Sequence, residues 1–312
     1  MSDRILRARL NFSYVKRRGR RFETMSDGHA GLSWFEYQVG GFGIGIVEGV
    51  LLGNAADIDQ GWLAAAVRES PASLIKLTRA LPDQSAELID QRQIEPNWIV
   101  VRHRRAAHEI LPLASTDEAT LARLGRHTRR NLRAARKLAA ASGLQFHVSD
   151  ARPLITDTER ADLAAKTRPL GLRTIELARL EAYVDETKRP FRSVVRDVEG
   201  AIISYCCGYF AAPDAAYLLF QLNDAAHHSI GPALLHRALL LPWLVEQRRA
   251  ELVFVHGCIG VLSHSCVPQL LEEVWLMRRS TWAYSCAAMI QWIKPGAPIG
   301  RLARLALDGT AT

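Results

Sequence analysis

Three short apolar segments, separated by two tight turns, constrain the fold of this chain more than any other feature of its sequence. The segments cover residues 191–196, 201–210 and 216–222, and the turns between them contain DVEG (residues 197–200) and AAPDA (residues 211–215). Turns this short join neighbouring strands that run in opposite directions. The sequence therefore predicts an antiparallel meander of three strands.

The segments after the meander predict further helices and strands. A short loop over residues 223–231 leads into a helix with Pro232 at its first position, where proline is well tolerated. A strand over residues 251–256, a short helix over 262–273 and a last strand over 274–279 follow. The order βββ–loop–α–β–α–β predicts an α/β (α+β) fold, with a mixed sheet and flanking helices.

The chain divides into three expected parts. Residues 1–30 are polar and basic, and we expect a partly flexible tail. Residues 31–113 mix short apolar runs with one helix near residues 59–69 and a strand near 98–104, which predicts an N-terminal α/β unit. Residues 114–312 form the larger unit, which includes helices near residues 156–167 and 174–188 and a C-terminal extension.

Composition narrows the kinds of partner and the compartment. The formal net charge is +8, which favours anionic partners such as nucleic acid, anionic lipid or phosphate-bearing cofactors. Five cysteines without paired spacing favour a reducing compartment over a disulfide framework. No signal peptide is evident, and glycines and Glu48 interrupt the longest apolar run, residues 39–56. We therefore expect a cytoplasmic protein, with a peripheral position on the inner membrane as an alternative.

The segment RHTRRNLRAARKLAA, residues 126–140, holds six Arg or Lys side chains in its first twelve positions. Small and apolar residues recur here at spacings of three and four, which predicts an amphipathic helix docked on the protein. The expected buried side comprises Leu121, Leu124, Thr128, Leu132, Ala135, Leu138 and Ala139. The expected basic side comprises Arg126, Arg129, Arg130, Arg133, Arg136 and Lys137. We expect this basic side to face one of three partners: tRNA, an anionic membrane surface, or the acidic residues Glu176, Glu181 and Asp185. No DNA-binding motif is present, and we expect no DNA partner.

Three segments and the element order together resemble a known superfamily. The segments are RHTRRNLRAARKL from residue 126, SIGPALL from residue 229 and FVHGC from residue 254. They resemble the GNAT acyltransferase superfamily, in the branch associated with cellulose and exopolysaccharide biosynthesis that is related to the Fem-type peptidoglycan aminoacyltransferases. The resemblance covers about residues 110–280 and implies two GNAT-like units. The Q/R-x-x-G-x-G/A turn of GNAT enzymes becomes HHSIGPA here, residues 227–233, and keeps one glycine.

The resemblance assigns the loop before residue 232 to an acyl donor, acetyl-CoA or another acyl-CoA. A helix N-terminus offers free N–H groups and a positive dipole end, and both attract phosphate. Ser229 adds a hydroxyl, and Gly231 allows close approach of the backbone. An ordinary Ser-capped helix is the alternative. The predicted cofactor-binding residues are Leu222, His228, Ser229, Ile230, Gly231 and Ala233.

Transfer of an acyl group to an amine needs a base that takes the amine proton and polarisation of the carbonyl. In a GNAT-like frame the acyl group lies between strands 216–222 and 251–256. The predicted catalytic residues near that position are His256, Glu176, Tyr209 and Asp224. Cys258 as an acyl carrier is an alternative. The histidines and cysteines over residues 256–266 lack zinc-site spacing, so we expect no metal.

Three functions remain open from the sequence. The first is a GNAT-like N-acyltransferase that moves an acyl group from acyl-CoA to an amine acceptor, such as an amino sugar or another precursor of the cell envelope or of an exopolysaccharide. The second keeps the fold but takes the acyl group from aminoacyl-tRNA, as Fem-type relatives do, and this would explain the basic segments. The third is a catalytically degenerate GNAT fold that serves as a binding or assembly subunit.

Overall fold

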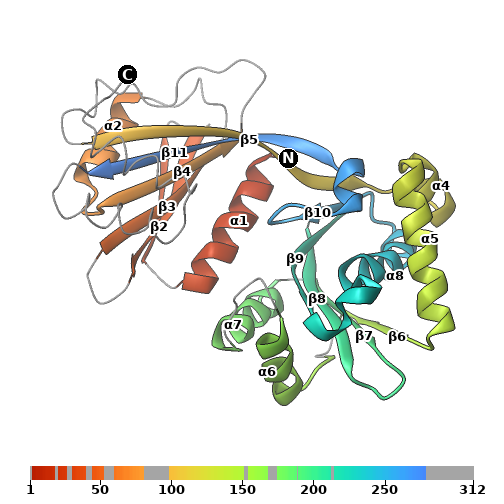
Figure 1. Ribbon diagram of the computed structural model, residues 1–312. Helices are drawn as coiled ribbons and strands as arrows, with labels where there is room; N and C mark the ends of the chain where they lie inside the picture. Colours follow the sequence, from red (N-terminus) through yellow and green to blue (C-terminus); the bar gives the residue numbers. More distant parts are fainter. Residues whose placement is uncertain are drawn as a thin grey trace. The chain divides into compact units, whose positions relative to one another are not determined.

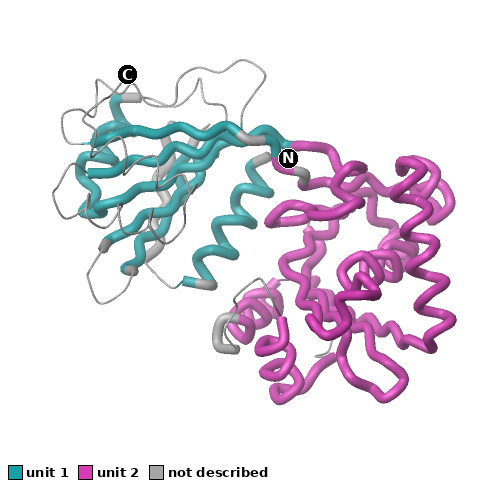
Figure 2. Tube along the Cα trace, viewed as in Figure 1, with its two compact units in different colours: residues 1–106, 269–312 teal, residues 107–268 magenta. Residues whose placement is uncertain are grey.

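The computed structural model describes residues 2–17, 20–26, 30–39, 44–52, 60–80, 98–150, 154–167, 174–187, 189–211 and 214–278. The chain forms two compact units, which Figure 2 shows in different colours. Unit 1 comprises residues 1–106 and 269–312, and unit 2 comprises residues 107–268. The divisions expected at residues 30 and 113 stay predictions, because compact units need not coincide with related halves of a chain.

Unit 1 is built on a mixed sheet with strand order β1-β2-β3-β4-β11-β5 (Figure 1). Its strands are β1 (Arg20–Ser26), β2 (Ala30–Val39), β3 (Ile44–Leu52), β4 (Leu74–Ala80), β5 (Trp98–Pro112) and β11 (Val267–Arg278). Strands β3 and β4 are parallel, and helix α2 (Gln60–Glu69) connects them, as a parallel pair requires. The core packs α2 against this sheet around Leu63, Ile75 and Trp98.

The N-terminal residues are more ordered than the sequence indicates. Residues 2–17 form helix α1 (Ser2–Arg17), whose Ile5 and Leu6 are completely buried. Arg17 donates a hydrogen bond of 2.7 Å to the hydroxyl of Tyr37, which in turn donates one to Glu48. The flexible tail expected over residues 1–30 is therefore helical over residues 2–17. A helix forms here because the basic residues alternate with apolar ones, which a helix gathers on one side.

Unit 2 is built on strands in the order β5-β10-β9-β8-β7-β6 (Figure 1). After β5, its strands are β6 (Gln145–Ser149), β7 (Pro190–Arg196), β8 (Ile202–Ala211), β9 (Ala215–Asn223) and β10 (Glu251–Phe254). The meander predicted from the two short turns is confirmed, because β7, β8 and β9 pair in antiparallel order. Strand β10 returns parallel to β9.

Helices cover both faces of this sheet. They are α4 (Asp117–Arg123), α5 (Arg126–Ala141), α6 (Asp157–Lys166), α7 (Thr174–Asp185) and α8 (Pro232–Glu246), with short 3-10 helices η2 (Ala225–Ile230) and η3 (Val261–Ser265). Alternate residues of β8 face opposite sides. Tyr205 reaches Glu181 of α7, whereas Phe210 contacts Trp243 of α8. Helix α5 packs its Leu132 into the same core as α8.

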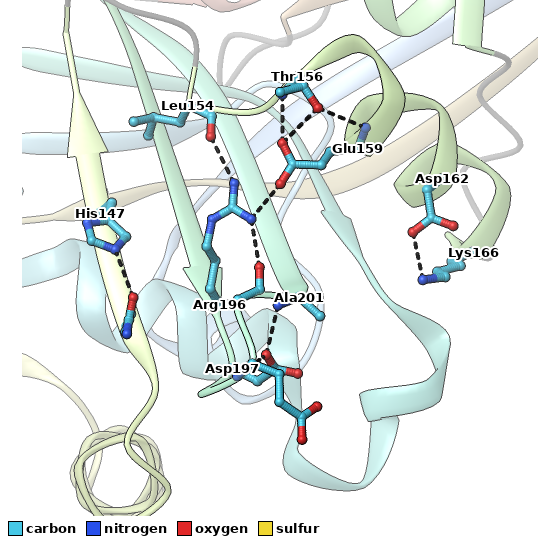
Figure 3. A network of polar contacts seen from close by, with 12 residues as sticks. His147, Leu154, Thr156, Glu159, Asp162, Lys166, Arg196, Asp197 and Ala201 are labelled. Carbon is cyan, nitrogen blue, oxygen red and sulfur yellow. Dashed lines mark hydrogen bonds and ion pairs between the residues drawn. The ribbon is translucent and has the colours of Figure 1, made fainter.

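Local signals explain where several helices begin and end. Helix α5 ends at Gly143, whose φ of +63° suits glycine, and Leu144 N–H donates to Ala139 O at 2.9 Å, as in a Schellman motif. Thr156 and Glu159 form a capping box at the start of α6. Figure 3 shows how Arg196 of β7 binds this helix start, with 2.6 Å from its Nη1 to Glu159 Oε1.

Two of the sequence predictions are wrong. The helix expected over residues 262–273 is only η3, and strand β11 follows it from Val267. Pairing with β4 and an ion pair between Glu272 and Arg79 outweigh the local preference of this segment for helix. In the basic segment, Leu138 is 37% exposed rather than buried, because it lies at the edge of the apolar stripe. Leu121 and Leu124 are buried as expected, but Leu121 lies in α4 and Leu124 is the residue that caps the end of α4.

Candidate active site at the open end of strand β9

Strand β9 continues beyond its partner β10, and this leaves an open strand edge. The two strands pair up to Leu218 and Phe254, and Val255 N–H donates to Leu218 O at 3.2 Å. The β8–β9 register shifts at the same level, between Cys207 and Gly208, as in a β-bulge that bends a strand. Among the described residues, none in 219–223 has a backbone hydrogen bond to β10.

Glycine at position 208 is required by this bulge. A Cβ atom there would overlap the carbonyl oxygen of Tyr217 and lie 2.6 Å from Cζ of Phe191. No side chain fits at such a distance, since protein interiors are close-packed. The bulge therefore depends on Gly208.

Asp224 lies directly after β9 and is 6% exposed. Its Oδ1 atom accepts a hydrogen bond of 2.8 Å from Ala226 N–H, so that it caps η2. Its Oδ2 atom lies 3.6 Å from Nδ1 of His227 and 4.0 Å from Nζ of Lys166 in α6. A carboxylate, an imidazole and an ammonium group thus meet at the end of the open strand.

Lys166 is held in place by a second carboxylate. Its Nζ atom lies 2.6 Å from Oδ2 of Asp162, one turn earlier in α6 (Figure 3). The hydrogen bond with Asp162, together with the charges of Asp162 and Asp224, raises the pKa of Lys166. The ammonium group therefore stays protonated at neutral pH. It can attract a developing negative charge but cannot act as a base.

A buried polar cluster lies on the α6–α7 face of the sheet. Tyr205 pairs with Leu222 in the sheet and donates a hydrogen bond of 2.6 Å to Glu181. Arg160 of α6 forms an ion pair with the same carboxylate. Burial and the neighbouring acidic groups raise the pKa of Tyr205, so its hydroxyl stays a neutral donor. This cluster fixes α6 and α7 beside the end of β9.

The opposite face carries a neutral histidine network. His236 of α8 is completely buried, with Nε2 2.7 Å from Ser193 Oγ and Nδ1 2.8 Å from Ser204 Oγ. Ser204 donates its own hydrogen to Asn223 Oδ1 at 2.8 Å. We infer that Nδ1 carries the imidazole proton, since Ser204 has no second hydrogen to give. Burial, then the charge of Arg237, lowers the pKa of His236 to about 3.

Several backbone N–H groups of the loop assigned to an acyl donor are already engaged in hydrogen bonds. Gly231 adopts the left-handed conformation with φ +61°, and its N–H donates to His228 O at 3.0 Å. Pro232 has no N–H, and the N–H groups of Leu234 and Leu235 both donate to Gly231 O. Of the other predicted cofactor-binding residues, Leu222 is buried, Ile230 and Ala233 are partly buried, and His228 and Ser229 are exposed. Their role stays a prediction.

Of the predicted catalytic residues whose side chains the structure describes, Asp224 lies at the end of β9. His256 is exposed and lies two residues beyond the last β9–β10 pair. Tyr209 pairs with Tyr217, about 20 Å along the strand from Asn223 at the usual rise per residue. The side chain of Glu176 lies outside the described residues. His227 and Lys166 lie beside Asp224, and neither is among the four predicted catalytic residues.

Helix α5 presents a basic face without acidic partners. Arg126, Arg130, Arg133 and Lys137 are exposed, and Arg129 is partly exposed. In the described part of the chain none of these five forms an ion pair, since Glu181 pairs with Arg160 and Asp185 with Arg192. Among the residues that the structure describes, only Arg136 of this helix has an acidic partner, and its Nη2 atom lies 2.8 Å from Asp117 Oδ1. Glu181 and Asp185, two of the acidic residues expected to neutralise this face, therefore pair with other arginines instead.

Comparison with known proteins supports the fold. No protein-family model and no curated protein matches the sequence. Among solved structures, the chain is similar to L-PGS from Bacillus licheniformis, with 14% identity, 97% of this chain and 93% of that chain covered, and a TM-score of 0.53. A conserved protein of unknown function from Bacteroides thetaiotaomicron VPI-5482 has 13% identity, coverage of 88% and 91%, and a TM-score of 0.52. FemX has 10% identity, coverage of 85% and 90%, and a TM-score of 0.50.

These likenesses concern the fold, and they confirm the expected fold class. The chain has a mixed α/β architecture, and its fold is similar to those of L-PGS and FemX. Within the described residues, no helix is long and apolar enough to cross a membrane. The same residues contain no group of three or more side chains able to hold a metal ion.

Proposed function

We propose that this protein is an acyltransferase that takes its acyl group from an aminoacyl-tRNA and transfers it to an amine. The observation that carries this proposal is the basic face of α5, defined as Arg126, Arg129, Arg130, Arg133 and Lys137. None of these five cations has an acidic partner among the described residues. Such a face gains free energy by releasing counterions from a polyanion.

The buried side of α5 supports a rigid presentation of these cations. Leu132 is completely buried, Thr128 Oγ1 donates to Val261 O at 2.9 Å, and Arg136 Nε donates to Ala238 O at 2.8 Å. The cations recur at spacings of three and four along the helix, so they lie on one side of it. A fixed row of this kind suits the phosphates of a nucleic acid backbone.

The chemistry of transfer fits the group at the end of β9. If Nδ1–H of His227 points to Asp224, the Nε2 atom keeps its lone pair and takes a proton from the attacking amine. The amine nitrogen then bonds to the ester carbonyl carbon, and the bond to the ribose oxygen breaks. His227 returns the proton to that oxygen. The Lys166 ammonium stabilises negative charge on the carbonyl oxygen.

A second candidate uses the same site with acyl-CoA, such as acetyl-CoA, and an amino sugar or envelope precursor as acceptor. The open edge of β9 favours it, because the amide groups of a linear thioester arm can pair with a free strand edge. Under this candidate the six predicted cofactor-binding residues hold the diphosphate. Several N–H groups between Asp224 and Leu235 already donate within the protein, and this favours the tRNA donor instead.

The two donors are separated by a transfer assay. Purified protein is incubated with a mixture of aminoacyl-tRNAs carrying labelled amino acids, and in parallel with labelled acetyl-CoA, together with a panel of simple amines and amino sugars. We expect amine-dependent loss of label from tRNA and none from acetyl-CoA. Transfer from acetyl-CoA alone would replace the proposal by the second candidate. Binding of tRNA or of anionic vesicles with transfer from neither donor would indicate a binding subunit or a membrane-surface role.

A further inference from the structure

Two thiols outside the candidate site, those of Cys258 and Cys266, belong to one buried apolar cluster in the segment after strand β10, and each is the hydrogen-bond partner of the other. Cys258 and Cys266 are the first and last residues of a nine-residue segment that contains η3. Both are free thiols and buried, each 7% exposed, whereas Ile259 next to Cys258 is 86% exposed. Cys258 therefore adjoins an exposed residue of the chain.

An arginine is fixed against one of these thiols. Arg237 of α8 donates from Nη1 to Cys258 Sγ at 3.5 Å and to Ile259 O at 3.3 Å. Its Nε atom donates to Gln221 Oε1 at 2.9 Å, and its guanidinium lies over the ring of Phe254. These contacts hold the positive charge next to Cys258 and not next to an acidic side chain.

The two thiols differ in acidity. A hydrogen bond from Cys266, and then the charge of Arg237, lower the pKa of Cys258 against the effect of burial. The same hydrogen bond and burial raise the pKa of Cys266, whose thiol also has Leu262 O as an acceptor at 3.4 Å. The thiolate form is the nucleophile in thiol chemistry. Cys258 is therefore the attacking partner and Cys266 the one that follows.

The other described cysteines provide a contrast. Cys206 and Cys207 are neighbours on β8 and completely buried, and burial raises the pKa of both thiols. Successive residues of a strand point to opposite faces, so these two thiols do not face each other. They serve as internal controls in the same molecule.

We propose that Cys258 and Cys266 form a redox-active dithiol, a modification site in which a low-molecular-weight disulfide oxidises the pair to an intramolecular disulfide. The Cys258 thiolate attacks the reagent, forms a mixed disulfide and releases one thiolate. Cys266 then loses its proton to the medium and attacks Cys258 Sγ, which forms the Cys258–Cys266 bond and releases the second thiolate. The protein pair loses two electrons, and the reagent is reduced to two thiols.

The test uses the full chain with Cys286→Ser, because Cys286 lies outside the described residues and its thiol would compete. Protein treated with oxidised glutathione is blocked with N-ethylmaleimide, digested and analysed by mass spectrometry without reduction. We expect the peptide that contains both cysteines to be two hydrogens lighter and unalkylated. Cys206 and Cys207 are expected to stay as thiols, which also reports that the protein remains folded.

Single variants identify the attacking thiol. With Cys266→Ser, glutathione is expected to accumulate on Cys258; with Cys258→Ser, Cys266 is expected to react at least about tenfold more slowly, since its thiolate fraction is smaller. Arg237→Gln is expected to slow the reaction of Cys258 in the Cys266→Ser protein. A pair that stays reduced while free thiol standards are oxidised would overturn the proposal, and so would equal reactivity of the two single variants.

Discussion

Oδ2 of Asp224 lies 3.6 Å from Nδ1 of His227, directly after the part of strand β9 that has no pairing with strand β10. The carboxylate is almost fully buried, and its other oxygen is engaged by Ala226 N–H. Asp224 is therefore oriented by the backbone, and its Oδ2 atom lies close to His227 Nδ1 without a hydrogen bond between them. In the proposed mechanism, His227 is the base and this carboxylate is its neighbour.

Loss of either member of the pair should slow transfer without unfolding the protein. We expect His227→Gln and Asp224→Asn each to lower the single-turnover rate by about a hundredfold, the usual contribution of a positioned general base. His228→Gln is the matched control, because His228 is exposed on the same 3-10 helix. Equal rates for His227→Gln and His228→Gln would remove His227 from the proposed mechanism.

The buried histidine of α8 predicts a pH dependence of stability. The pKa of His236 is about 3 in the folded protein, against a usual value of 6.5. The unfolded chain binds the proton more readily, so His236 stabilises the fold above pH 6.5 and loses this contribution as the pH falls from 6.5 toward 3. Between these pH values, His236 lowers the free energy of unfolding by at most about 1.4 kcal/mol for each pH unit.

Urea unfolding at pH 7 and pH 5 measures this dependence. His236→Asn is expected to be less stable at pH 7 and to lose less stability on going to pH 5. His147→Gln, on the exposed strand β6, should keep the slope of the unaltered protein. An unchanged slope in His236→Asn would contradict the neutral, buried assignment.

A second acid-sensitive contact lies at the start of α6. The hydrogen bond from Arg196 is the main reason that the pKa of Glu159 falls to about 2. This carboxylate therefore stabilises the fold above its usual pKa of 4.5, and the contribution is lost as the pH falls through 4.5 toward 2. Glu159→Gln should flatten the stability curve in this window, whereas Glu199→Gln, in the exposed β7–β8 turn, should leave it unchanged.

The bulge beside the open strand predicts a position where only glycine is tolerated. Gly208→Ala forces a methyl group against Phe191 and the backbone of Tyr217, and we expect a loss of about 3 kcal/mol in the free energy of unfolding. Gly125→Ala is the control, since a Cβ there meets nothing within 4 Å. Similar stabilities for the two variants in urea unfolding would show that the bulge relaxes without cost.

Local sequence signals predict much of unit 2. The tight turns predict the β7–β8–β9 meander, Pro232 marks the start of α8, and Gly143 marks the end of α5; all three are confirmed. These features depend on backbone preferences of a few consecutive residues. The segment over residues 262–273 shows the limit, because pairing with β4 decides its structure.

The candidate site is harder to predict, since its groups come from distant parts of the chain. Asp224 can be proposed from the sequence because it follows a predicted strand directly. Lys166 belongs to α6, and nothing in the local sequence indicates that its ammonium group lies near Asp224. Tyr209 was selected by its place on a neighbouring strand, but the register puts it level with Tyr217, far from Asp224. Register depends on the whole sheet rather than on the strand itself.

The central claim, that the basic face of α5 binds an aminoacyl-tRNA donor, is tested most directly by the salt dependence of tRNA binding. The dissociation constant of the protein–tRNA complex is measured from 50 to 300 mM salt for the unaltered protein, for Arg129→Gln with Arg133→Gln, and for a control of equal charge change, Arg68→Gln with Arg248→Gln. We predict that the α5 variant lowers the slope of log K against log salt by about 1 to 2, while the control does not change it. Equal slopes and affinities in all three proteins would contradict the claim.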